Sequence, residues 1–259
     1  MLINSISGLF MNELFISLKK EIYDRLDDSL DISDDSLYEV IDECIYEAVA
    51  ASRLSLSQRE LLRKRLYNSI KKLDILQELI EDDDITEIMV NGYNNIFIEK
   101  NGRITRWNRA FESEEKLADI AQRIAALSNK IINESTPIVD TRLPDGSRIN
   151  MVLPPIAIDG PVITIRKFYK TPMDIGRMIQ LGSITEEAAE YLNMLVKARY
   201  NIFISGGTGS GKTTFLNALS NFIPKDERII TIEDSAELQI KNAANLVRLE
   251  ARNANVEGK

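Results

Sequence analysis

The sequence predicts an α/β protein in which a helical region and a small α+β domain precede a phosphate-loop α/β domain. Three observations support this fold class. Apolar residues recur at helical spacing up to about residue 81, and at strand-like spacing between residues 85 and 168. A short apolar run at 202–204 then leads into a glycine-rich stretch and a further helical pattern. We therefore expect a helical region at 1–81, an α+β domain at 82–169, a linker at 170–183 and an α/β domain at 184–259.

The composition limits what the chain can be. With 259 residues, 44% of them hydrophobic, it can bury one or two ordinary cores. A net charge of −8 argues against a surface that binds nucleic acid by neutralising phosphates. The sequence has one cysteine and no histidine, which excludes an internal disulfide, histidine-based catalysis and most zinc sites. No apolar run reaches 18 residues, so we expect no direct membrane span.

Three helices are predicted in the N-terminal region. Helical spacing is clear over 12–30 and 37–49, and Cys44 falls in step with the apolar positions of the second helix. We therefore interpret Cys44 as a core residue rather than a reactive thiol. The sequence SQRE at 57–60 has the pattern of a capping box, which predicts that a third helix begins there and runs to about Glu81.

Strands and one helix are predicted in the α+β domain. Asn101-Gly102 is a strong signal for a two-residue hairpin turn. Trp107 is expected to pack rather than to bind a ligand. The helix is predicted at 112–131, with Ile131 on its buried face. The strands are predicted at 85–90, 96–99, 104–107, 138–143, 148–153 and 162–168.

The α/β domain is predicted to begin with a helix that the capping box SITE at 183–186 opens. The apolar run 202–204 is interpreted as a strand before the glycine-rich stretch. The run 229–232 is interpreted as a buried parallel strand with Glu233 and Asp234 at its carboxyl end, where α/β proteins bind ligands. One more strand is expected at 246–249.

The glycine-rich stretch fits the phosphate-loop pattern G-x-x-x-x-G-K-[ST] at every fixed position. Glycines allow the backbone to curl around a phosphate, and successive N–H groups with the following helix favour an anion. Lys212 would supply charge to the β- and γ-phosphates of ATP, and the Thr213 hydroxyl would bind Mg²⁺. The alternative is a glycine-rich turn that binds nothing. The predicted nucleotide-binding residues are Gly206, Gly207, Thr208, Gly209, Ser210, Gly211, Lys212, Thr213 and Thr214.

Several further motifs occur in the order found in one family. They are ITEIMVNG at 85–92, LPDGSRIN at 143–150 with Pro154-Pro155, IRKF at 165–168, the phosphate loop, IED at 232–234 and AELQ at 236–239. Over roughly residues 70–259 the chain resembles the CpaF-type pilus-assembly ATPases of the type II/type IV secretion ATPase superfamily. This combination is more specific than the phosphate loop alone.

The resemblance implies a subunit of a ring-shaped homohexamer. ATP would lie between the N-terminal α+β domain and a RecA-like domain, and its hydrolysis would drive pilus assembly or protein secretion. The implied partners are platform proteins of the bacterial inner membrane, with the ATPase on its cytoplasmic side.

The same resemblance implies roles for individual residues. Lys212 and Thr213 match the Walker A pair, and Glu233 matches the acidic box, where it would polarise the attacking water or help to hold Mg²⁺. The alternative for Glu233 is a strand-end cap. Family members continue into a Walker B strand and a histidine box, which this sequence does not contain. We therefore expect an incomplete RecA-like domain, in a fragment that does not hydrolyse ATP by itself.

Three arginines of the α+β domain are candidates for contact with the γ-phosphate, where positive charge assists phosphoryl transfer. In a five-residue loop, Arg142 and Arg148 would face each other, which is unfavourable unless an anion lies between them. A two-residue loop on Asp145-Gly146 would put them on opposite faces. Arg166, on the next strand, is the third candidate. The alternative is that all three are ordinary exposed strand arginines.

Other function classes remain as alternatives. A small GTPase would need the guanine-reading sequence N-K-x-D after the loop; Asn129-Lys130 precedes the loop and lacks the aspartate. Another RecA-like enzyme, such as a helicase, would need a basic or aromatic strand-binding face, which the acidic composition disfavours. A third possibility is a nucleotide-binding or ring-docking module that does not hydrolyse ATP.

Overall fold

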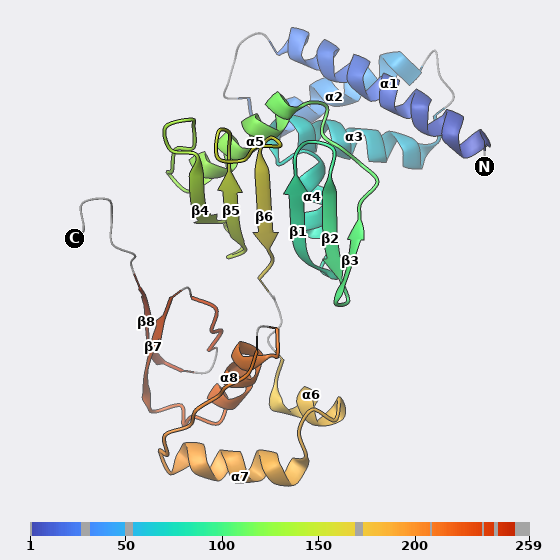
Figure 1. The fold of residues 1–259 in the computed structure, drawn as a ribbon. Coiled ribbons are helices and arrows are strands. Elements are labelled where there is room, and N and C mark those ends of the chain that lie inside the picture. Colours follow the sequence, from blue (N-terminus) through green and yellow to red (C-terminus); the bar gives the residue numbers. More distant parts are fainter. Residues whose placement is uncertain are drawn as a thin grey trace. The chain divides into compact units, whose positions relative to one another are not determined.

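The computed structural model describes residues 2–26, 32–49, 54–168, 173–207, 209–234, 236–240 and 243–251 (Figure 1). The chain forms two units, residues 1–168 and residues 169–259. The first unit contains an N-terminal group of helices and a six-stranded sheet, each with its own hydrophobic cluster.

Three helices open the first unit: α1 (Leu2–Arg25), α2 (Asp34–Val49) and α3 (Leu56–Lys71). Their apolar faces meet in a cluster that is almost fully shielded from solvent. Cys44 lies within this cluster, which confirms its interpretation as a core residue. Other members are Leu18, Ile22, Leu37, Ile41, Leu62 and Leu66.

The third helix begins earlier than expected. Its N-cap is Ser55, whose hydroxyl accepts the Gln58 N–H at 3.3 Å while the Gln58 side chain accepts the Ser55 N–H at 2.8 Å. The predicted capping box at 57–60 was therefore wrong. The sequence carries two overlapping capping patterns two residues apart, and the structure uses the first.

The predicted third helix is interrupted before it reaches Glu81. Helix α3 ends at Lys71, and α4 (Ile75–Glu81) starts after Asp74, whose φ of 54° is incompatible with a continuous helix. The carbonyls left open at the end of α3 are bound from another helix, because Arg123 donates to Ile70 O at 3.1 Å and to Lys72 O at 2.7 Å. Contacts between elements thus help to stabilise this break.

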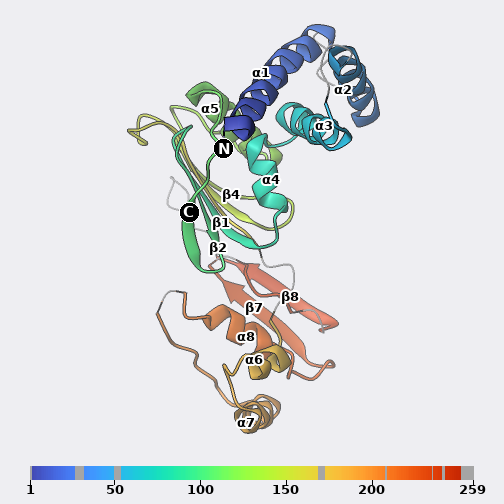
Figure 2. The same cartoon turned by 90° about the vertical axis from the view of Figure 1, so that its right-hand side faces the viewer.

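The sheet is antiparallel throughout, with strand order β3-β2-β1-β6-β5-β4. Figure 2 shows α4 along one face of it, and apolar residues of α4 and α5 (Glu114–Leu127) form one cluster with the strands. Asn101 and Gly102 both have positive φ, which confirms the predicted hairpin turn. Trp107 packs against the same cluster, as predicted. The strands are β1 (Ile85–Asn91), β2 (Ile96–Lys100), β3 (Arg103–Arg106), β4 (Ile138–Arg142), β5 (Arg148–Val152) and β6 (Val162–Arg166).

Helix α5 is shorter than the predicted helix at 112–131. It begins after the N-cap Ser113 and ends at Leu127, and Asn129 then adopts a φ of 53° that ends the helical geometry. Ile131 was expected on the buried face, but its side chain is 74% exposed. Apolar spacing therefore overestimated the helix by one turn.

The second unit contains α6 (Ile175–Gln180), α7 (Glu186–Lys197), α8 (Lys212–Ser220), β7 (Arg228–Glu233) and β8 (Asn245–Glu250). Helix α6 lies within the segment predicted as a linker. Helix α7 is capped by Thr185, whose hydroxyl accepts the Ala188 N–H, rather than by Ser183 as predicted. Strands β7 and β8 pair in parallel.

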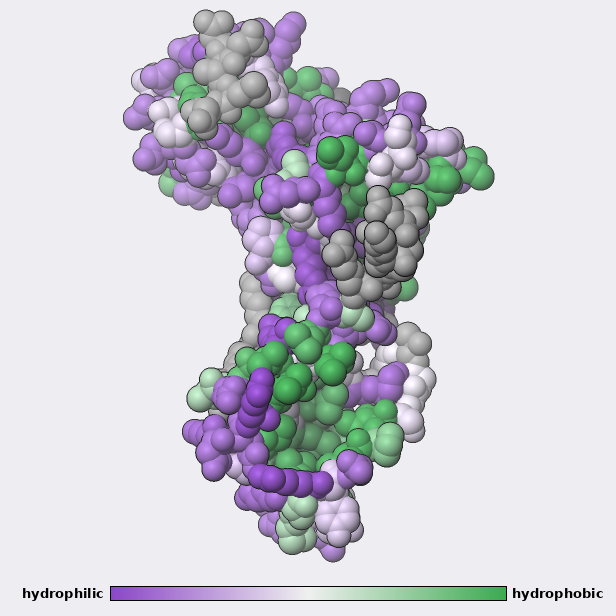
Figure 3. Space-filling model, turned by 90° about the vertical axis from the view of Figure 1, so that its left-hand side faces the viewer, coloured by the Kyte–Doolittle hydropathy of each residue, from purple (hydrophilic) through white to green (hydrophobic). Residues whose placement is uncertain are grey.

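Two strand predictions for the second unit need correction. Residues 202–204 are not a strand, since β7 and β8 pair only with each other among the described residues and no ladder includes this run. Strand β7 is not buried, because the side chain of Ile232 is 77% exposed and that of Ile230 is 51% exposed. Figure 3 shows abundant apolar side chains on the visible face of this unit. A parallel sheet is normally covered on both faces.

Candidate functional site

The glycine-rich stretch forms a loop that ends at α8, as its sequence predicts. Gly209 has a φ of 72° and Gly211, the N-cap of α8, has a φ of 87°. Residues with a Cβ rarely adopt these φ values, so the loop favours glycine at both positions. Helix α8 begins at Lys212, and its N-terminal N–H groups are therefore next to the loop. Thr208 lies outside the described residues.

The loop is also tightly curled. A Cβ on Gly206 would lie 2.5 Å from Ser210 Oγ, so the Ser210 side chain would have to move to accept a larger residue. The Lys212 ammonium donates to the Gly207 carbonyl oxygen at 2.6 Å. The lysine charge is thus held over the loop itself, and Thr213 and Thr214 follow it in the first turn of α8. This arrangement of glycines, helix N-terminus and lysine suits a polyphosphate.

Glu233 ends β7 and anchors the chain that follows it. Its Oε2 atom accepts two consecutive N–H groups, from Glu237 at 2.7 Å and from Leu238 at 2.9 Å. Its Oε1 atom is buried and has no hydrogen-bond partner in the described part of the chain. The carboxylate therefore serves as a cap with one oxygen. The second oxygen is a buried polar atom that this hydrogen-bond pattern leaves unexplained.

One residue that sequence reasoning missed joins α8 to this segment. Asn217 Oδ1 accepts the Gln239 N–H at 2.8 Å, and Asn217 is 9% exposed. Helix α8 and Glu233 are thus both hydrogen-bonded to the same segment, residues 236–240. The sequence could have indicated Asn217 by its spacing, because a residue four positions after Thr213 lies on the same face of the helix.

The three candidate arginines form a row across the sheet of the first unit. Arg142 pairs with Arg148, Arg148 pairs with Arg166, and Arg166 pairs with Glu87. The structure therefore selects the five-residue loop, which the Leu143 N–H closes by donating to Ser147 O at 2.8 Å. Their neighbours on the strands, such as Ile149 and Ile165, point into the core, so the arginines belong to the opposite face. This row and the phosphate loop lie in different units.

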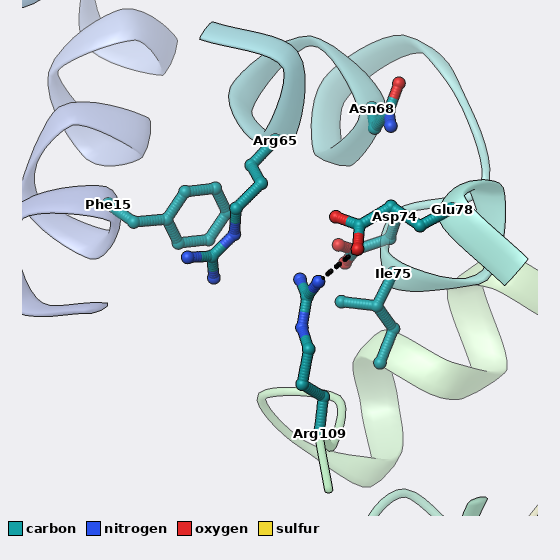
Figure 4. Close-up of a pocket in the computed structure, with 7 residues that line it drawn as sticks. All are labelled: Phe15, Arg65, Asn68, Asp74, Ile75, Glu78 and Arg109. Carbon is teal, nitrogen blue, oxygen red and sulfur yellow. Dashed lines mark hydrogen bonds and ion pairs between the residues drawn. The ribbon is translucent and has the colours of Figure 1, made fainter. Parts of the chain in front are cut away.

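A small pocket in the first unit does not suit a nucleotide. It lies where α1, α3 and α4 meet, and its lining includes an ion pair between Arg109 and Glu78 at 2.5 Å (Figure 4). The space within it is about 10 Å³, about enough for one water molecule. Burial raises the pKa of the Asp74 carboxyl there, while Lys116 opposes the shift. The other lining residues are Phe15, Arg65, Asn68 and Ile75.

The described residues contain neither a ready-made metal cluster nor a membrane-crossing helix. No group of three or more histidine, cysteine, aspartate or glutamate side chains among them could by itself enclose a metal ion. None of the helices described is both long enough and apolar enough to cross a membrane.

Comparison with known proteins gives a family match over most of the chain. The model of the family described as "Type II/IV secretion system protein" matches residues 69–257. An uncharacterised protein of Methanocaldococcus jannaschii, MJ0781, is 36% identical over 254 residues, which cover 93% of this chain and 35% of that protein. The type IV secretion system protein VirB11 of Brucella suis is 32% identical over 200 residues, which cover 68% of this chain and 55% of VirB11.

Among solved structures, the VirB11 ATPase of the Brucella suis type IV secretion system in complex with sulphate is 30% identical. The TM-score is 0.39, and the match covers 68% of this chain and 59% of that one. The chain thus spans between about one third and three fifths of the length of these relatives.

Proposed function

Because the chain belongs to the type II/IV secretion system protein family, we propose that it is the ATP-binding part of a motor subunit for pilus assembly or protein secretion, of the CpaF type. The observation that carries this proposal is the curled loop, with its required glycines, its lysine and the start of α8. Glycines in turns that bind nothing also adopt positive φ, so the support comes from their combination with Lys212 and the start of α8.

In this proposal the backbone N–H groups of 206–211 and the N-terminus of α8 hold the phosphates of ATP. Lys212 adds a positive charge, and Thr208 and Thr214 belong to the same binding loop. Thr213 and Glu233 would hold Mg²⁺, which neutralises phosphate charge during transfer. The buried, unpartnered Oε1 of Glu233 fits this role, because a carboxylate oxygen is a preferred ligand of Mg²⁺ or of a water bound to it.

Arg142, Arg148 and Arg166 are proposed to supply positive charge to the γ-phosphate. Their alignment across β4, β5 and β6 supports this, because it brings three arginines to one face of the sheet. Arginine suits such a role, since it stays charged and can bind phosphate oxygens with two N–H groups.

The assembly and the location are proposed from the resemblance to the family. We propose a homohexameric ring at the cytoplasmic face of the inner membrane, in which subunits act on platform proteins of the secretion or pilus machinery. The name of the Brucella suis relative, a type IV secretion system protein, supports this setting. The net charge of −8 disfavours nucleic acid as a partner.

Hydrolysis is proposed to require residues beyond this 259-residue chain. The exposed apolar residues of the parallel β7–β8 pair support a larger RecA-like sheet in the working motor. By itself, this chain is proposed to bind ATP without hydrolysing it. The alternative for the whole protein, a nucleotide-binding or ring-docking module, would have the same binding site and no turnover.

Calorimetric titration of the 259-residue chain with ATP and with GTP, each with Mg²⁺, tests the proposal. We expect the chain to bind ATP, and the complete motor to hydrolyse ATP in preference to GTP, because no guanine-reading sequence follows the loop. Absence of ATP binding would refute the nucleotide site. Equal turnover of ATP and GTP by the complete motor would count against the CpaF-type assignment.

A further inference from the structure

Side chains from three different elements bind the segment that follows β7. Glu233 at the end of β7 accepts the N–H groups of residues 237 and 238, and Asn217 in α8 accepts the N–H of Gln239 at 2.8 Å. Arg248 in β8 donates to the Leu238 carbonyl oxygen at 3.1 Å. Three consecutive backbone N–H groups are therefore satisfied by side chains rather than by a strand or helix.

This arrangement links two parts of the proposed nucleotide site. Asn217 lies one helical turn after Thr213, on the same face of α8. Its amide oxygen fixes Gln239, and the two residues before Gln239 fix one carboxylate oxygen of Glu233. A rotation of the Glu233 carboxylate would break both of its hydrogen bonds, so the direction of Oε1 depends on the position of this segment.

We propose that Asn217 is a positioning residue, which holds the segment 237–239 so that the free oxygen of Glu233 keeps the orientation needed for Mg²⁺ or its bound water. This inference rests on the proposed function, because it assigns Asn217 a role at the same site. Asn217 does not touch the nucleotide in this scheme. It acts as outer-shell partners of metal ligands do, by fixing the orientation of a group that binds.

The first test measures hydrogen exchange of individual amides by NMR on the 259-residue chain. Asn217→Ala should speed exchange of the Gln239 amide about fivefold, the effect of losing one ordinary hydrogen bond. Asn217→Asp keeps an acceptor oxygen at the same place and should restore the protection. Asn221→Ala is the matched control, because Asn221 caps the same helix and its side chain donates to the Asn217 carbonyl instead.

The second test measures ATP affinity with Mg²⁺ and with EDTA. Mg²⁺ is expected to increase the affinity for ATP, and Asn217→Ala should reduce this increase about tenfold, as the loss of an outer-shell partner does. The affinity for metal-free ATP should change less than about twofold. If Asn217 only stabilised α8, both affinities would fall together. That result, or unchanged Gln239 exchange, would overturn the inference.

The outcomes separate this inference from the proposed function. If wild type binds ATP through Lys212 and Asn217→Ala keeps the full Mg²⁺ effect, the positioning role is wrong and the nucleotide site stands. If wild type binds no ATP, the proposed function fails and the positioning role fails with it.

Discussion

Arg142 on β4 lies directly opposite Arg148 on β5, an arrangement that brings two positive charges together on one face of the sheet. The five-residue turn between them imposes this register, because the Leu143 N–H must reach the Ser147 carbonyl oxygen. Directly opposed like charges in a sheet usually lower stability. Arg166 on the next strand extends this row and lies opposite Glu87. We propose that the row binds phosphate, and its charges also affect the stability of the sheet.

Replacement of one arginine should separate these two effects. In the complete motor, Arg148→Gln should lower ATP turnover at least about tenfold, because the positive charge that the arginine supplies to the γ-phosphate would be lost. The free energy of unfolding should stay within about 0.5 kcal/mol of wild type. Arg103→Gln, at an exposed position on β3, is the control. Unchanged turnover would mean that the three arginines are ordinary surface residues without a role in catalysis.

Lys212→Ala should weaken binding of ATP with Mg²⁺ by about 2–3 kcal/mol, roughly 30- to 150-fold, because a charge-assisted contact is lost. Isothermal titration calorimetry of the 259-residue chain measures this change. Lys225→Ala removes an exposed lysine of the same unit and should have no effect. The phosphate-loop assignment would not survive equal affinities of Lys212→Ala and wild type.

The 259-residue chain should hydrolyse ATP only at the background rate, and Glu233→Gln should not lower that rate further. In hydrogen exchange, residues 173–251 should be less protected than residues 85–168, because the two-stranded sheet is exposed and the six-stranded sheet covers a large core. A steady-state ATPase assay and exchange mass spectrometry provide the measurements. Turnover that Glu233→Gln abolishes would show that this chain is sufficient for catalysis.

Arg123→Ala should lower the free energy of unfolding of the first unit by about 1–2 kcal/mol, because two carbonyls at the end of α3 lose a charged donor. Urea denaturation followed by circular dichroism measures the loss. Arg103→Ala is the control. No difference between the two variants would mean that water replaces the guanidinium at no cost.

Asp74→Asn should change how stability depends on pH. Burial raises the pKa of the Asp74 carboxyl, so the unfolded chain loses this proton at a lower pH than the folded chain does. As pH rises from about 4 towards the raised pKa, the wild-type free energy of unfolding should therefore fall relative to that of Asp74→Asn. Urea denaturation of both proteins across this pH range tests the sign. A constant difference between them would contradict the expected shift.

The sequence by itself determined the features that depend on residues close together in the chain. The hairpin at Asn101-Gly102 requires positive φ, the core position of Cys44 follows from helical spacing, and the loop before Lys212 requires glycine. The capping boxes were less certain, because patterns at Ser55 and Ser57 overlap and only the geometry of the chain selects between them.

Only the tertiary structure decided the features that depend on contacts between distant elements. The break at Asp74 is stabilised by Arg123 of another helix, and the link between α8 and Glu233 passes through Asn217 and a segment 22 residues further along the chain. The run 202–204 has the composition of a strand, but the described chain gives it no hydrogen-bonded neighbour. Apolar periodicity records which residues prefer burial, whereas a hydrogen bond requires a partner in space, and that partner is defined only when the chain has folded.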